Sequence, residues 1–183
     1  MTERGSPPPR VTPGEVLDRA LLDMLDGPVT PSNEADVPEL ISLLNDLLAT
    51  AVVCWLRGQQ YGTVVAGVHR QPVAELLLSN ADSELQYVRA LADRINQLGG
   101  TPNLDPGRIG ERSHASFRDY PATDPGAMLK ESLLAVRVVI QICQESVRWI
   151  AAADPTSRRL LERILEAKER EAGELRSLLR DNL

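Results

Sequence analysis

Aromatic side chains are scarce in this sequence, at 3% of 183 residues, although hydrophobic residues make up 43%. Leucine and alanine supply much of that hydrophobic content, and the apolar positions recur every three or four residues. This period favours an all-α fold over a sheet. The chain is long enough to bury one core, and its length does not require a second one.

Positive charge is also in short supply. The net charge is -6 and the isoelectric point is near 5.0. A protein that neutralises phosphates needs a concentrated basic face, so we expect no nucleic-acid partner. The first ten residues lack the apolar stretch of a secretory signal, and no window is judged long and apolar enough to span a bilayer. We therefore expect a cytoplasmic protein with no membrane partner.

Cysteine and histidine occur only twice each. Cys54 and Cys143 fall inside predicted helices without a partner at ligand spacing, which favours buried, reduced thiols over a disulfide framework or a zinc site. His69 lies in a helix break and His114 in a long connection. Both are interpreted as capping or surface residues.

The first 35 residues form an N-terminal tail that contains a short helix. Residues 1–11 are polar and rich in proline, which is typical of a disordered tail. An amphipathic helix is predicted over about 13–26, with an apolar face made of Leu17, Leu21, Met24 and Leu25. This face could dock on its own bundle or on a neighbouring subunit.

Residues 36–183 contain four long amphipathic segments. The first two are expected to run from Asp36 to about Val68 and from about Pro72 to Leu98, and the other two each begin with an Asp-Pro pair. A connection of some two dozen residues, rich in Pro, Gly and Ser, separates the second from the third. Since bundle loops are usually shorter, this connection is predicted to cross the length of a four-helix bundle.

Two stretches carry a resemblance to a known family. "RINQLGGTPNL", at the end of the second segment, and "DPTSRRLLERIL", at the start of the fourth, are similar to ferritin-like proteins of the bacterioferritin and Dps type. The resemblance covers about residues 36–180. It implies a ferritin-like four-helix bundle with a di-iron ferroxidase centre at its middle. Such a centre takes a carboxylate from each of two helices and a Glu-x-x-His pair from each of the other two.

The family's ligand positions can be placed one by one on this sequence. They fall on Ala51, Glu84, Tyr87, Val136, Lys168 and Glu171. Glu84 alone keeps the expected residue, and Glu171 is a carboxylate where a histidine is expected. The resemblance therefore implies a degenerate site with no cofactor. In the alternative interpretation, the protein binds iron, and Glu84 and Glu171 are the ligands.

Lys168 is unusual even when the family resemblance is left aside. It is one of two lysines in a chain with eighteen arginines, and it falls on an apolar stripe. A buried ammonium without a partner is very costly, whereas two flanking carboxylates would keep it charged. We predict a metal-free cluster of Lys168, Glu84 and Glu171 with the hydroxyl of Tyr87. If the helix is rotated by one position, Lys168 instead extends to the solvent.

These features favour one function and leave a second open. The first is a ferritin-like subunit that has lost its ferroxidase centre and serves as a non-catalytic structural or binding subunit, alone or beside an active ferritin-like paralogue. The alternative is an active iron-binding or iron-storage protein with an atypical metal site. No nucleophile-base pair or phosphate loop indicates another enzyme class. We expect a homo-oligomer, at least a dimer, and leave dimer or cage open.

Overall fold

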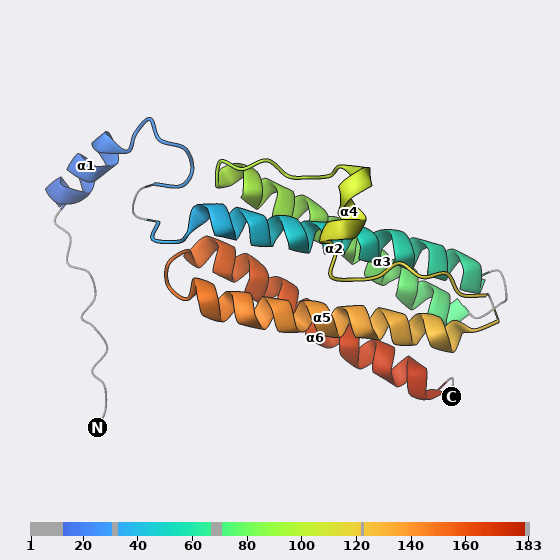
Figure 1. Ribbon diagram of the computed structural model, residues 1–183. Coiled ribbons are helices and arrows are strands. Elements are labelled where there is room, and N and C mark those ends of the chain that lie inside the picture. The colour runs from blue at the N-terminus through green and yellow to red at the C-terminus, as the bar shows by residue number, and fades with distance from the viewer. Residues whose placement is uncertain (1–12, 31–32, 67–70, 122, 182–183) are drawn as a thin grey trace, which may run out of the picture.

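The described part of the chain folds into six helices and a long connection. The computed structural model describes residues 13–30, 33–66, 71–121 and 123–181 (Figure 1). The helices are α1 (Pro13–Leu22), α2 (Val37–Ala66), α3 (Gln71–Gln97), α4 (Pro106–Arg112), α5 (Pro125–Ile150) and α6 (Pro155–Asp181). The fold is all-α, as the sequence predicts.

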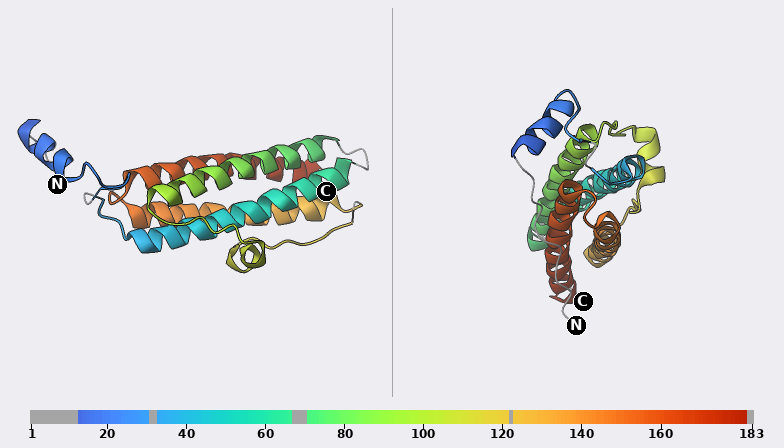
Figure 2. Two further views of the ribbon diagram at one scale, coloured as in Figure 1. Left: turned by 90° about the horizontal axis from the view of Figure 1, so that it is seen from above. Right: turned by 90° about the vertical axis from the view of Figure 1, so that its left-hand side faces the viewer.

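Four of these helices form the bundle. α2 packs against α3 and α5 packs against α6, so the bundle is built from two antiparallel hairpins (Figure 2). The connection between α3 and α5, residues 98–124, is called the crossover below. The predicted four-helix bundle with a long crossover is confirmed. The predicted end of the first helix at Val68, and His69, lie outside the described residues.

Two large apolar clusters fill the bundle, one toward each end, and a smaller third cluster joins α2, α5 and the crossover. The first cluster includes Leu44, Leu91 and Leu161, and the second includes Tyr61, Leu77, Met128 and Leu175. Between the two clusters, three helices each bury a charged side chain: Arg57 on α2, Glu84 on α3 and Lys168 on α6. α5 stays apolar at this level. The middle level is therefore where the sequence departs from simple core packing.

α2 is apolar over most of its length. The expectation that no window could span a bilayer is wrong for this helix, because Val37–Ala66 is long and apolar enough by length and composition. However, 61% of its apolar window is buried inside the protein. α2 contacts α3, α5 and the crossover helix α4, which explains its apolar composition as that of a core element.

The crossover follows α2 along most of its length, as predicted. Its one unexpected feature is α4, which begins after Asp105, whose side chain accepts a hydrogen bond from the backbone N–H of Gly107 at 3.0 Å. Side-chain bonds then join α2 to the crossover in the same order along both segments: Asn45 to Thr101, Arg112 to Asp46, the His114 N–H to Thr50, and Arg57 to the Ser116 carbonyl.

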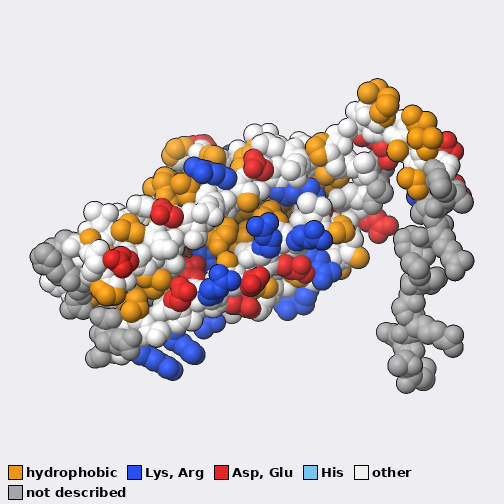
Figure 3. Space-filling model, turned by 180° about the vertical axis from the view of Figure 1, so that it is seen from behind, with side chains coloured by type: hydrophobic (Ala, Val, Ile, Leu, Met, Phe, Trp, Pro, Cys, Tyr) orange, Lys and Arg blue, Asp and Glu red, His pale blue; other side chains and the backbone are white. Residues whose placement is uncertain are grey.

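α1 lies apart from the bundle (Figures 1 and 3). The short N-terminal helix is present, but it ends at Leu22 rather than near residue 26, because the chain turns at Asp23 and Asp26. Its large apolar side chains are exposed, from 49% for Val16 to 82% for Leu22. Within the described chain, the apolar face of α1 is therefore uncovered.

Candidate functional site at the centre of the bundle

Lys168 lies between two carboxylates at the middle of the bundle. Its Nζ atom donates to Oε1 of Glu84 at 2.5 Å and to Oε2 of Glu171 at 2.6 Å. The side chain of Lys168 is 1% exposed, so it does not reach the solvent. The structure thus brings together the three charged residues that the sequence analysis grouped. They are called the central cluster below.

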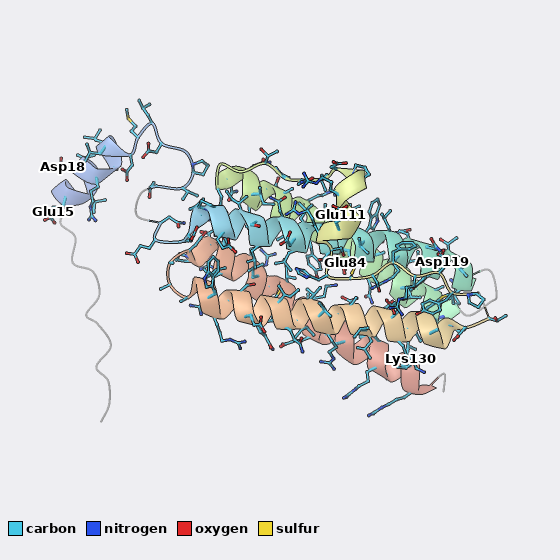
Figure 4. The ribbon with its side chains drawn as sticks, viewed as in Figure 1. Glu15, Asp18, Glu84, Glu111, Asp119 and Lys130 are labelled. Atoms are coloured by element: carbon cyan, nitrogen blue, oxygen red, sulfur yellow. The ribbon has the colours of Figure 1, made fainter. Side chains whose placement is uncertain are left out.

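Two helices position the central cluster. Lys168 and Glu171 are three residues apart on α6, and residues at this spacing share one face of a helix. Glu84 comes from the middle of α3, and Figure 4 shows it inside the bundle, between the helices. The inward stripes of these two helices therefore meet at the central cluster.

Tyr87 joins the cluster by its ring rather than by its hydroxyl. The ammonium of Lys168 lies 5.4 Å from the centroid of the Tyr87 ring, a distance suited to a cation–π contact. The predicted hydrogen bond from the Tyr87 hydroxyl is absent among the described residues. Glu84 and Tyr87 are three residues apart on α3, so they share one face of that helix.

The two remaining family positions hold apolar side chains beside the cluster. Ala51 on α2 and Val136 on α5 are 6% and 4% exposed. Ala51 borders a cavity of about 10 Å³ that also touches Lys168. Val136 borders a second cavity, of about 20 Å³, that touches both glutamates. All six positions therefore surround one place in the bundle.

The electrostatics of the cluster keep the lysine charged. Burial alone lowers the pKa of Lys168, but the charges of Glu84 and Glu171 outweigh this and hold the pKa above its ordinary value. Burial raises the pKa of Glu171, and Lys168 offsets only part of that rise. The ammonium is therefore protonated at neutral pH, and the cluster carries one more carboxylate than it has cations.

The two cysteines are buried near the same level. Burial raises the pKa of both Cys54 and Cys143 to about 12. Both are free thiols. A thiol with so high a pKa forms almost no thiolate at neutral pH, which makes it a poor nucleophile and a poor metal ligand. His114, which the sequence predicts to be a capping or surface residue, lies in the crossover and donates its backbone N–H to the Thr50 hydroxyl.

A second buried network was missed by the sequence analysis. Arg57 on α2 is 3% exposed and donates to the Ser116 carbonyl at 2.8 Å, and its Nη1 lies 4.0 Å from Oε1 of Glu131 on α5. Glu131 in turn accepts from the Ser116 hydroxyl at 2.5 Å. These residues anchor the crossover. The sequence feature that could have indicated this network is the position of Arg57 and Glu131 next to the apolar stripes of α2 and α5.

The side chains at the six family positions can be compared with the ligands that a pair of iron ions requires. Both carboxylates of the central cluster already bind one ammonium, Ala51 and Val136 supply no donor atom, and a tyrosine stands in place of a histidine. Within the part of the chain that the structure describes, no group of three or more His, Cys, Asp or Glu side chains is arranged to hold a metal. This donor set does not fit a di-iron centre.

Comparison with known proteins places the chain among ferritin-like proteins. A nutrient stress-induced DNA-binding protein of a Nostoc species is 27% identical over 168 residues, which is 91% of this chain and 86% of that relative. The dodecameric thioferritin of Bacteroides fragilis, a bacterioferritin-related protein, is 27% identical with a TM-score of 0.76, covering 81% of this chain and 88% of that chain.

The same fold occurs in a more distant structure. Dps from Thermosynechococcus elongatus has a TM-score of 0.71 at 18% identity, covering 78% of this chain and 90% of that one. The ferritin family, described as a ferritin-like domain, matches residues 41–182. This match spans all four bundle helices and the crossover. The chain therefore belongs to the ferritin family and contains one ferritin-like domain.

Proposed function

We propose that this protein is a ferritin-like subunit whose central cluster has replaced the di-iron ferroxidase centre. In this proposal it oxidises no iron and serves as a non-catalytic structural or binding subunit. The observation that carries the proposal is the position of the Lys168 ammonium, 2.5 Å and 2.6 Å from the two carboxylates that would otherwise be ligands.

Charge explains why the lysine and iron compete. A ferrous ion at this level would need both glutamates, and it would lie against an ammonium whose pKa is held high by the same carboxylates. Like charges at close range in a poorly solvated site repel strongly. To bind iron, the protein would have to expel or deprotonate Lys168. The family positions also hold no histidine, so no imidazole makes up for the carboxylate ligands that are missing at Ala51 and Val136.

The direct test is the binding and oxidation of ferrous iron. The purified protein is titrated with Fe²⁺ without oxygen, and bound iron is counted after desalting. Air is then admitted, and oxidation is followed by absorbance. We expect no tightly held iron and no oxidation faster than in buffer. Two tightly held irons per chain would overturn the proposal in favour of the alternative, an active iron-binding protein that uses Glu84 and Glu171.

A restored variant provides the positive control. It combines the changes that return the family residues: Ala51→Glu, Tyr87→His, Val136→Glu, Lys168→Glu and Glu171→His. If only the replaced ligands prevent iron binding, this variant should bind iron and accelerate its oxidation. Failure of the folded variant to do so would show that features outside these positions prevent iron chemistry.

Assembly is the second part of the proposal. The thioferritin relative is named as dodecameric, and we propose that this chain also forms a homo-oligomer of two or more copies in the cytoplasm, alone or with an active ferritin-like paralogue. Light scattering after size exclusion separates a dimer from a cage. A monomer at micromolar concentration would contradict this part.

Binding to DNA is a property in the name of the Nostoc relative. We propose that this chain does not share it, because its net charge of -6 opposes a polyphosphate. The described part of the N-terminal segment includes Glu15, Asp18, Asp23 and Asp26 against Arg19 alone. A mobility-shift assay at low salt, where such binding is strongest, should show no retarded duplex. A shift that disappears as salt is added would contradict the expectation.

A further inference from the structure

A small cavity lies between the central cluster and the Arg57–Glu131 network. Its volume is about 20 Å³, and its polar wall comes from all four bundle helices: Cys54, Arg57, Asn80, Glu84, Ser132 and Glu171. Neither the family positions nor the proposed function explains Asn80 or Ser132. The cavity therefore needs an account of its own.

One wall residue has an unused hydrogen-bonding group. The Nδ2 atom of Asn80 is buried, and it is the single side-chain nitrogen or oxygen of that kind in the described chain without a partner. Asn80 lies one helical turn before Glu84 on α3, so both face the same side. Buried polar groups are nearly always hydrogen-bonded, and an orphan of this kind calls for a partner that is not a protein atom.

The wall limits what that partner can be. Two carboxylates, from Glu84 and Glu171, exclude an anion. Lys168, which binds both of those carboxylates, and Arg57, which lines the cavity itself, disfavour a metal cation. The occupant must accept from Asn80 and donate to a carboxylate, and a space of about 20 Å³ holds one or two water molecules and little more.

We propose that this cavity binds an ordered water that joins Asn80 to the central cluster. The water accepts a hydrogen bond from the Asn80 amide and donates one to a carboxylate oxygen of Glu84 or Glu171, with the Ser132 hydroxyl as a further partner. Because water both donates and accepts, it satisfies the amide whichever of its polar atoms faces the cavity. It also supplies a hydrogen bond to the carboxylate that the single ammonium leaves in excess.

The first test is a crystal structure of the full chain at a resolution that shows waters. A density peak within hydrogen-bonding distance of both Asn80 and a carboxylate of the central cluster is expected. An empty cavity would overturn the proposal. So would a peak whose height rises when sodium in the crystal is exchanged for rubidium, because that peak would be a cation.

The second test counts long-lived internal waters in solution by oxygen-17 magnetic relaxation dispersion. Asn80→Leu removes the amide and fills part of the cavity, and it should lower the count by one relative to the unaltered protein. Asn96→Leu, on the exposed side of the same helix, is the matched control and should leave the count unchanged. An equal count in the Asn80→Leu variant would contradict the proposal. If that variant does not fold, the density in the first test decides.

Discussion

Lys168 balances two negative charges that have little access to water. Removing the ammonium would leave Glu84 and Glu171 without the cation that now lies between them, in a place that is largely closed to solvent. Carboxylates in this position must either repel each other or take up protons, and both cost folding free energy. Lys168 is therefore expected to contribute more to the free energy of unfolding than its two hydrogen bonds alone would.

Replacing Lys168 with Met tests this value. The long apolar side chain keeps most of the volume, so the loss reports the charge. We expect the free energy of unfolding in urea at pH 7 to fall by about 3 kcal/mol, the scale of a broken buried ion pair.

The control for this experiment is Lys130→Met. Lys130 is the other lysine of the chain, and it is exposed at the start of α5 (Figure 4). It should change stability by less than about 0.5 kcal/mol, as surface substitutions usually do. Equal effects of the two substitutions would show that the central ammonium contributes no more than a surface charge.

How far the site could be predicted depends on the kind of contact. Glu84, Lys168 and Glu171 interrupt apolar stripes, so helical periodicity alone marks them. The role of the Tyr87 ring and the orphan amide of Asn80 depends on side-chain geometry across helices, which periodicity does not contain. Arg57 and Glu131 were missed because their partner is the crossover, whose path no local pattern specifies.

At the scale of elements, α2 and α3 approach closely where glycine allows it. A Cβ atom added at Gly58 would lie 2.9 Å from Cβ of Ala81 and 3.2 Å from the Leu77 carbonyl oxygen. Neither neighbour can move without shifting α3 itself. The close contact of these two helices therefore depends on the missing side chain.

Gly58→Ala should destabilise the protein even though alanine is the better helix former. The steric cost of overpacking, about 1–3 kcal/mol, exceeds the helix-propensity gain of about 1 kcal/mol. Gly173→Ala is the control, because no atom lies within 4 Å of a Cβ added there. In thermal unfolding, the first substitution should lower the midpoint and the second should raise it. A higher midpoint for Gly58→Ala would mean that the helices separate easily.

The start of α6 depends on a buried aspartate. Asp154 accepts hydrogen bonds from the Ser157 N–H and hydroxyl and from Arg94, whose Nη2 lies 2.7 Å away. Burial alone raises the pKa of Asp154, but these hydrogen bonds and the charge of Arg94 outweigh it, and the pKa is lowered. A lowered pKa means that the ionised form stabilises the fold.

Asp154→Asn should therefore have an effect that depends on pH. Above the ordinary aspartate pKa of about 4 the full stabilisation is present, and it is lost as pH falls through the lower pKa of the folded state. We expect the variant to lose about 3 kcal/mol at pH 7. In urea unfolding from pH 7 to pH 2, the difference from the unaltered protein should shrink below about pH 4. A difference that stays constant over this range would contradict the role of the charge.

The four long helices were predictable from apolar periodicity and caps, and α4 was not. Asp105-Pro106 has the same cap pattern as the starts of α5 and α6, but only seven helical residues follow it. A segment this short buries no residue, so it has no apolar stripe. Its existence depends on contacts with α2, such as that between Arg112 and Asp46.

At the scale of the whole molecule, the face of α1 is an exposed apolar surface in the described chain. Leu17 and Leu21 lie one turn apart and are 59% and 56% exposed. If this face contacts another copy, replacing both leucines with glutamate should lower the mass measured by light scattering at a fixed concentration. Arg19→Glu, on the polar side of the helix, controls for the added charge and should leave the mass unchanged. An unaltered mass in the double variant would exclude α1 from the interface.

The attachment of the crossover along α2 has a consequence for a chain that is cut. Bonds from Asn45 near one end to Tyr61 near the other, which donates to the Arg118 carbonyl at 2.5 Å, retain this segment independently of its covalent continuity. A protease nick in the crossover should therefore leave both fragments associated. The two helical hairpins, produced as separate polypeptides that divide the crossover between them, would reassemble into one particle. We therefore expect this ferritin-like domain to assemble from two separate halves.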